Sequence, residues 1–133
     1  MVLTMKRNQS KPKKEKGPGA NMNEEIKKDI LNNKNDLIYG TFCHYLFEEG
    51  FFDEHLLANL IGKCGICLKE DADEDEVTNL LKWLVISTEQ CFSSNNDSND
   101  LYVIKNYSTA MEEGWHIDWK PKIMKLINGN LNI

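Results

Sequence analysis

The sequence predicts an all-α protein with about six helices in consecutive antiparallel hairpins, forming a bundle or a short solenoid-like stack. Hydrophobic residues recur at intervals of three and four along most of the chain after Met22, as they do on one face of a helix. Capping residues and glycines stand at the ends of these stretches. The only strand-like segments, 101–104 and 131–133, are too short to build a sheet.

The first three predicted helices cover the segments 24–31, 37–49 and 53–69. Acidic residues in the first turn of 24–31 suit a helix N-terminus. Gly50 follows the second segment and fits a left-handed helix end, and Asp53 is expected to cap the third helix. The second and third helices should therefore form an antiparallel hairpin. The hydrophobic stripe of the third helix comprises Leu56, Leu57, Leu60, Ile61, Cys64 and Leu68.

The fourth helix is predicted over 76–90, with Asp73 as part of a capping arrangement. It ends before the polar loop 93–100, which is rich in turn-forming residues. A fifth helix is predicted over 101–114, where a glycine closes it, and a sixth over 118–128, with a proline in its first turn. The third and fourth helices carry the longest uninterrupted stripes, so we expect them to be the core pair.

The charges divide the chain into two parts. Residues 1–20 contain six basic residues and one acidic residue, whereas residues 21–133 contain ten basic and twenty acidic residues, a net charge of −10. The first part is rich in Lys, Pro, Gly and Ser, which favours disorder. We therefore expect a disordered basic tail over 1–21 and a single acidic helical domain over 22–133. Met22 would also serve as a natural start, in which case the tail is absent from the native protein.

No pattern of catalytic residues is evident. The chain lacks the common glycine-rich nucleotide-binding motifs, and its three histidines are scattered over different elements. We therefore predict a protein that is not an enzyme and has no cofactor and no metal. The sequence shows neither a signal peptide nor a membrane span, which indicates a cytoplasmic protein.

The pair Cys64-Gly-Ile-Cys67 has the spacing of half a zinc site or of a redox pair. A zinc site needs four ligands, and the usual second pair is missing. Cys64 also continues a hydrophobic stripe, so buried thiols are the favoured interpretation, with metal binding and redox chemistry as the alternatives.

Two groups of residues are candidates for binding a partner. The acidic run, residues 70–76, holds six acids in seven residues, more than helix capping requires, although a solvated loop is the simpler interpretation. Tryptophans are common interface anchors but also common core residues. The candidate partner-binding residues are Glu70, Asp71, Asp73, Glu74, Asp75, Glu76, Trp115 and Trp119.

In its size, its acidic loop, its composition rich in Asn and Lys and its start at Met22, the chain resembles the small acidic immunity proteins of bacterial toxin systems, including contact-dependent growth inhibition. The resemblance is one of type over residues 22–133 and rests on no shared motif, so it assigns no role to any residue. It implies a cytoplasmic inhibitor without chemistry of its own. Such an inhibitor neutralises a cognate basic toxin, commonly a nuclease, by covering its active site with an acidic surface. Neither a membrane nor a nucleic acid is expected as the partner.

Two alternatives remain open. A helical adaptor or regulatory module could contact nucleic acid through the basic arm 1–21, because clustered Lys and Arg bind phosphates. A metal-dependent or redox protein could be built on Cys64 and Cys67. Loss of function on removal of 1–21 would favour the first alternative, and bound metal would favour the second.

Overall fold

The computed structural model describes the backbone of residues 18–71 and 74–129 and the side chains of residues 24–71 and 74–129. These residues form helices and connecting segments without a β-strand, which confirms the predicted all-α class. The elements in chain order are α1 (Pro18–Leu31), the short turn η2 (Asn32–Lys34), α2 (Phe42–His44), the π-turn η3 (Tyr45–Glu49), α3 (Glu54–Glu70), α4 (Asp75–Asn95), α5 (Thr109–Gly114), the π-turn η4 (Trp115–Trp119) and α6 (Lys120–Ile127).

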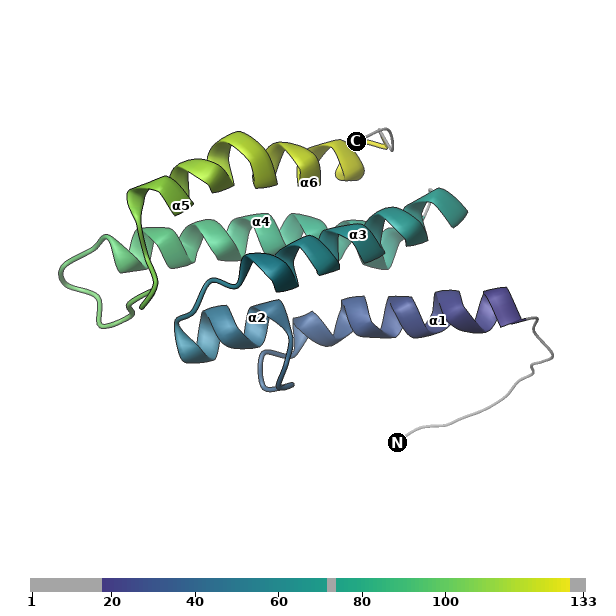
Figure 1. Ribbon diagram of the computed structural model, residues 1–133, viewed down its shortest axis with the longest axis horizontal. Helices are drawn as coiled ribbons and strands as arrows, with labels where there is room; N and C mark the ends of the chain where they lie inside the picture. Colours follow the sequence, from purple (N-terminus) through teal and green to yellow (C-terminus); the bar gives the residue numbers. More distant parts are fainter. Residues whose placement is uncertain (1–17, 72–73, 130–133) are drawn as a thin grey trace.

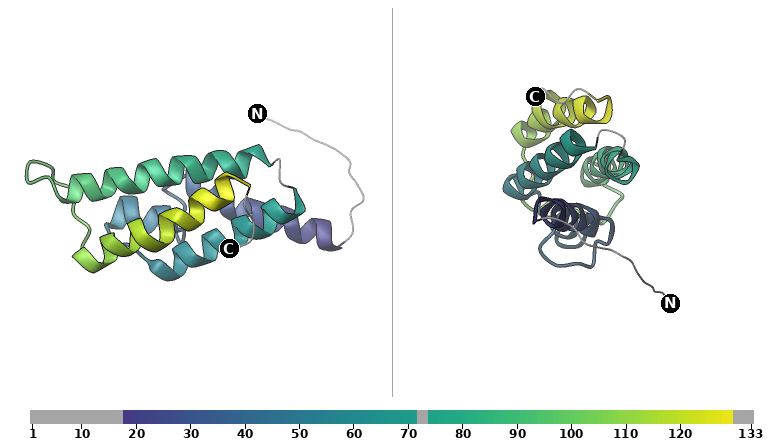
Figure 2. Two further views of the ribbon diagram at one scale, coloured as in Figure 1. Left: turned by 90° about the horizontal axis from the view of Figure 1, so that it is seen from above. Right: turned by 90° about the vertical axis from the view of Figure 1, so that its right-hand side faces the viewer.

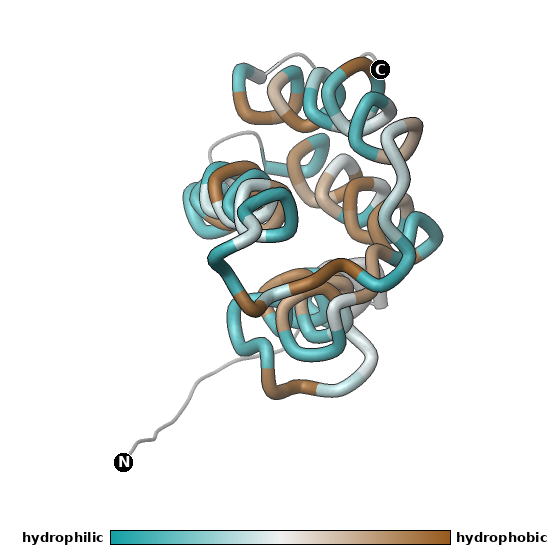
Figure 3. Tube along the Cα trace, turned by 90° about the vertical axis from the view of Figure 1, so that its left-hand side faces the viewer, coloured by the Kyte–Doolittle hydropathy of each residue, from teal (hydrophilic) through white to brown (hydrophobic). Residues whose placement is uncertain are grey.

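The helices are arranged in three layers (Figures 1 and 2). The middle layer is formed by α3 and α4, which lie side by side, with α1 and α2 on one side and the α5–α6 rod on the other. Both outer layers contact both middle helices, because α1 packs on α3 and α4 and so does α6. Hydrophobic and hydrophilic residues alternate around the helices (Figure 3), as expected for helices that each bury one face.

The core is centred on α3 and α4, as the sequence predicts. Asp53 caps α3, since its carboxylate accepts a hydrogen bond of 3.1 Å from the Leu56 amide. Gly50 has a left-handed φ of 67°, and a Cβ at that position would lie 2.4 Å from the Val103 carbonyl oxygen. Gly50 and Asp53 therefore determine where the preceding turn ends and where α3 begins. The buried residues of the two helices are Leu57, Leu60, Ile61, Cys64, Cys67, Leu68, Val77, Leu80, Leu81, Leu84, Val85, Thr88 and Phe92.

The second helix is shorter than predicted, because residues 37–41 form turns and Leu37 is exposed. Three local features end the helical pattern here. The Asn35 side chain accepts a hydrogen bond from the Leu37 amide, Gly40 has a φ of 93°, and Thr41 caps α2 by accepting from the His44 amide. The spacing of the hydrophobic residues in 37–41 is thus accidental.

The predicted fifth and sixth helices are also corrected. Residues 101–108, the first part of the predicted fifth helix, are not helical, and α5, η4 and α6 continue one another as a single rod. Ile104 is buried outside any helix, and its amide is satisfied by a hydrogen bond that it donates to the Asn95 side chain. Asn106 exchanges two hydrogen bonds with the backbone of Phe52, so the long connection is tied to the segment before α3.

The rod continues past Gly114 because that residue has an ordinary helical φ of −60°. Pro121 then lies inside the rod, where a proline normally removes one hydrogen bond and clashes with the preceding turn. The π-turn directly before it widens the helix, with the Lys120 amide donating to the Trp115 carbonyl. This local widening accommodates a proline that the sequence had suggested to be near a helix start.

At the N-terminal side, α1 begins at Pro18, inside the segment 1–21 that was expected to be disordered. Proline at the first helical position is favourable, because its missing amide proton is not needed there. Residues 1–17 and the strand-like segment 131–133 lie outside the described residues. Within the part that is described, no helix is both long and apolar enough to cross a membrane.

Candidate functional site

The acidic run lies at the turn between α3 and α4, at one end of the bundle. Glu70, Asp71, Asp75 and Glu76 are exposed and Glu74 is half-buried, whereas Asp73 and its neighbour Ala72 lie outside the described residues. The turn therefore presents most of its carboxylates to solvent, as an electrostatic binding surface requires.

Part of the run has a structural role. Glu74 caps α4, because its carboxylate accepts from the Glu76 amide at 3.2 Å. Lys27 of α1 contacts both side chains, with its ammonium nitrogen 3.0 Å from Glu74 and 2.7 Å from Glu76. These hydrogen bonds raise the pKa of Lys27, and the bond from Lys27 lowers the pKa of Glu76. Lys27 thus ties α1 to the start of α4 and neutralises part of the run.

A small cavity of about 220 Å³ opens beside this turn. Glu24 of α1 adds a further carboxylate to those of the run, and the sulfur-bearing Cys67 forms part of the wall. The acidic surface is therefore larger than the sequence run alone and includes the neighbouring turn of α1. The residues that line the cavity are Glu24, Lys27, Cys67, Glu70, Asp71 and Glu74.

The two tryptophans proposed as anchors, Trp115 and Trp119, differ in burial, and both are distant in sequence from the acidic run. Trp115 is fully buried in the core, where its ring lies 6.4 Å from that of Phe92, so it is not available to a partner on the surface. Trp119 is half-buried, and the Lys122 ammonium lies 5.2 Å above its ring. Of this pair, Trp119 alone has surface that a partner could reach.

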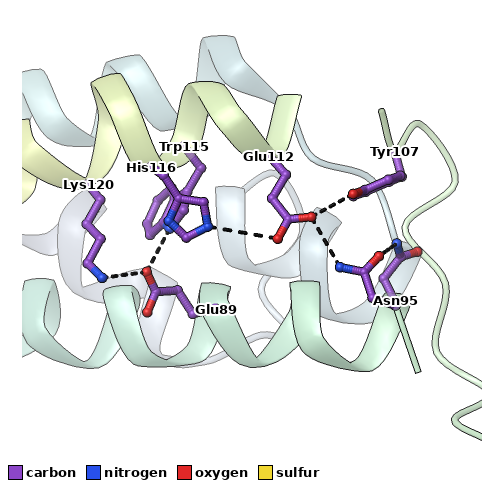
Figure 4. A network of polar contacts seen from close by, with 8 residues as sticks. Glu89, Asn95, Tyr107, Glu112, Trp115, His116 and Lys120 are labelled. Atoms are coloured by element: carbon purple, nitrogen blue, oxygen red, sulfur yellow. Dashed lines mark hydrogen bonds and ion pairs between the residues drawn. The ribbon is translucent and has the colours of Figure 1, made fainter. Parts of the chain in front are cut away.

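A network of polar contacts joins α4 to the α5–α6 rod (Figure 4). Glu89 of α4 accepts a hydrogen bond of 3.0 Å from the Trp115 indole and contacts the Lys120 ammonium at 2.8 Å. Burial raises the pKa of Glu89, but these two donors outweigh burial and hold the pKa below its ordinary value. Glu89 therefore holds the Trp115 indole in place through a hydrogen bond, and its charge is balanced by Lys120.

Glu112 forms the second half of the network. Its carboxylate accepts from the Tyr107 hydroxyl at 2.6 Å and from Asn96 at 3.2 Å, and it lies 3.9 Å from His116. Glu89, Glu112 and His116 line a cavity of about 250 Å³. Both carboxylates accept hydrogen bonds from, or pair with, side chains of the protein itself. The network therefore has a structural role, which is to join α4 to the α5–α6 rod. Sequence reasoning missed it because the three residues come from two helices whose register was not known.

The four cysteines are free thiols, and Cys43, Cys64 and Cys67 are buried. The favoured interpretation of Cys64 and Cys67 as core residues is thus confirmed. Burial raises the pKa of Cys64 to about 12, which keeps the thiol protonated and unreactive. In the described residues, no group of three or more His, Cys, Asp and Glu side chains is placed to hold a metal ion.

The comparisons with known proteins do not assign the chain to any class. No family model, no curated protein and no solved structure matches it.

Proposed function

We propose that this protein is a non-enzymatic inhibitor of the immunity type, which neutralises a basic protein toxin by covering its active site with an acidic surface. The observation that carries the proposal is the acidic end of the bundle. There Glu24 of α1 lines one cavity with Glu70 and Asp71, and the exposed Asp75 begins α4, while Lys27 contacts Glu74 and Glu76. The net charge of −10 over residues 21–133 has the same sign.

The mechanism is electrostatic competition. A nuclease holds its polyanionic substrate through Lys and Arg side chains that contact phosphates. Carboxylates held on a rigid helical end can occupy the same positions. Long-range attraction also speeds the encounter between two oppositely charged proteins. An inhibitor of this kind works by occupying the site and needs no reaction of its own.

The structure decides which carboxylates can be changed in a test. Glu74 and Glu76 belong to the cap and the Lys27 contact, so replacing them would disturb the start of α4. Glu70 and Asp75 are exposed, and neither side chain takes part in the Glu74 cap or in the Lys27 contact. The double variant Glu70→Gln, Asp75→Asn therefore removes two charges and should keep the fold, at a cost of about 0.3–1 kcal/mol because Asp75 lies in the first turn of α4.

The test is purification of the full chain from its source cell, identification of the protein that accompanies it, and co-expression of the two. The proposal predicts a basic accompanying protein that is toxic alone and harmless together with this chain. Protection should weaken in the Glu70→Gln, Asp75→Asn variant. A partner that is acidic, or a toxin that remains harmful in the presence of this chain, would contradict the proposal.

The second candidate is the adaptor that contacts nucleic acid through the basic arm. Residues 1–17 lie outside the described residues, so no contact supports that role. It stays a prediction that removal of residues 1–17 tests. Full protection by the shortened chain would argue against it.

A further inference from the structure

A buried histidine, His44, lies where two irregular segments meet. It is the last residue of α2 and is only 9% exposed. The turn 35–41 precedes α2, and the π-turn η3 follows it directly. The ring nitrogen Nε2 is enclosed and has no hydrogen-bond partner among the described residues. A buried polar atom without a partner is costly, so the state of this ring affects the segments around it.

The two ring nitrogens of His44 each face an oxygen. Nδ1 lies 2.8 Å from the carbonyl oxygen of Asp36 in the turn, and Nε2 lies 3.7 Å from a carboxylate oxygen of Glu49 at the end of η3. A carbonyl and an ionised carboxylate only accept hydrogen bonds. A neutral imidazole carries one N–H, so either tautomer leaves the other nitrogen as an acceptor that faces an oxygen. Only the protonated ring, with an N–H on both nitrogens, is attracted to both oxygens at once.

The titratable side chains that face the ring in the described structure come from the turn and from η3. They are Asp36, Tyr39, Tyr45, Glu48 and Glu49. Glu48 is hydrogen bonded to the Asp36 side chain, which raises the pKa of Glu48, and the charge of His44 acts on this pKa in the opposite direction. From the segment before α3, Asp53 acts on Tyr45. A positive charge on the ring is therefore attracted from both the turn and η3.

The turn 35–41 forms part of the wall of a cavity of about 310 Å³. It contributes residues 38–41 to this wall, and α1, η2, α2 and α3 contribute the others. Within the turn, the amides of Leu37 and Ile38 both donate to Asn35, so these bonds hold the shape of the turn itself. The bond between His44 and the Asp36 carbonyl instead joins the turn to α2. The position of this part of the cavity wall therefore depends on the His44 ring.

We propose that His44 is a pH-sensitive switch for the turn 35–41: the protonated ring bridges Asp36 and Glu49 and holds the turn against α2, and loss of the proton releases the turn. The closed turn places the protonated ring between two acceptors, whereas an open turn leaves it only one of them. The closed form therefore binds the proton more tightly, and acidification favours it. Imidazoles in general change charge between about pH 5 and 8, so the switch acts near neutral pH. This inference is independent of the proposed function, because it concerns the turn and its cavity and not the acidic end of the bundle.

The test follows the full chain by NMR at about pH 8, where an ordinary imidazole is neutral, and at about pH 5.5, where it is protonated and an ordinary glutamate is still charged. The nitrogen resonances of the His44 ring report which nitrogens carry protons. The protection of the Leu37 and Ile38 amides from hydrogen exchange, corrected for the intrinsic exchange rate, reports closure of the turn. At the lower pH we expect protons on both nitrogens and about fivefold higher protection of both amides, the size expected for an ion pair with one exposed partner. Protonation without a change in protection, or a ring that stays neutral at the lower pH, would overturn the inference.

Glu49→Gln and Glu48→Gln form a matched pair of variants, because both residues are exposed acids of η3 and each change removes one charge. Glu49→Gln should abolish the gain in protection at the lower pH. At about pH 8 its amide can donate to the neutral Nε2, so protection there should equal or exceed that of the original protein. Glu48→Gln should keep the gain, because the ion pair with the ring comes from Glu49. A gain that survives in Glu49→Gln, or that is lost equally in both variants, would assign the pH dependence to the carboxyl groups as a whole and overturn the inference.

Discussion

Replacing Leu81 with Ala should destabilise the protein strongly. Leu81 lies in the second turn of α4 and is fully buried, with an exposed fraction of 0%. The change removes three buried carbon atoms, which at about 0.8 kcal/mol each gives about 2.4 kcal/mol for transfer alone. The cavity left behind adds to this value, and measured Leu→Ala costs in buried sites are about 2.7–5 kcal/mol. We therefore expect a loss of about 3–4 kcal/mol in the free energy of unfolding.

The assay is urea unfolding followed by circular dichroism, with the free-energy change taken from the midpoint and the slope. Ile86→Ala is the matched control, because Ile86 lies on the same helix and is 61% exposed. The control should change the free energy of unfolding by less than about 0.5 kcal/mol. A cost below about 1 kcal/mol for Leu81→Ala, or equal costs for both variants, would refute the placement of α4 at the centre of the core.

Three further results are expected. Gly50→Ala should lower the free energy of unfolding in urea by at least about 1–2 kcal/mol, because a Cβ at this left-handed position meets a carbonyl oxygen at 2.4 Å. The control Gly62→Ala, where a Cβ on α3 meets open space, should raise the free energy of unfolding by about 0.5–1 kcal/mol. Lys27 lowers the pKa of Glu76, so the stability that this contact contributes is present above the ordinary carboxyl pKa of 4.5 and is lost as the pH falls through the lower folded pKa. The difference in stability between the original protein and Glu76→Gln should therefore vanish on acidification. A difference that stays constant with pH would contradict the contact. Cys64 should resist labelling by iodoacetamide at pH 8 until the protein is unfolded. Protein purified without chelator should also hold far less than one zinc ion per chain. Rapid labelling of the folded protein, or stoichiometric zinc, would contradict the buried-thiol interpretation.

The parts of the fold that the sequence predicted well are those with strong local signals. Long hydrophobic stripes mark α3 and α4, and Gly50 and Asp53 act locally as expected, whereas α4 is capped by Glu74 and not by the expected Asp73. The all-α class follows from these stripes alone. Such features depend on near neighbours in the chain, so a single sequence is sufficient to find them.

The features that the sequence did not reveal depend on contacts between distant segments. Residues 101–108 had a helix-like spacing, but Asn95 at the end of α4 and the backbone of Phe52 before α3 hold this segment through hydrogen bonds to Ile104 and Asn106. The burial of Trp115 depends on its packing beside Phe92 and on the clamp by Glu89 from another helix. Tertiary contacts of this kind override local propensity, and the sequence does not show which helix faces will meet.

The candidate binding surfaces were predicted in part. The acidic run was visible as a charge cluster, but the sequence did not show that Lys27 neutralises Glu74 and Glu76. His44 stood out in the sequence as one of three scattered histidines, but its neighbours did not, because a turn at Gly40 and a π-turn after His44 bring the Asp36 carbonyl and Glu49 to its ring. Irregular backbone thus set contacts that regular periodicity could not predict.

The most direct test of the central claim is the rate of association between this protein and the basic protein that accompanies it, measured as a function of salt. The claim predicts fast association at low salt and a steep fall in the association rate as salt is added. The fall is expected because salt screens the charges, and the Debye length shortens to about 10 Å at 0.1 M ionic strength. Glu70→Gln, Asp75→Asn should slow association and flatten its salt dependence, whereas the charge-matched control Glu113→Gln, Asp118→Asn on the exposed face of the α5–α6 rod should do so far less. Identical rates and identical salt dependence in the original protein and both variants would show that the acidic end of the bundle does not meet the partner.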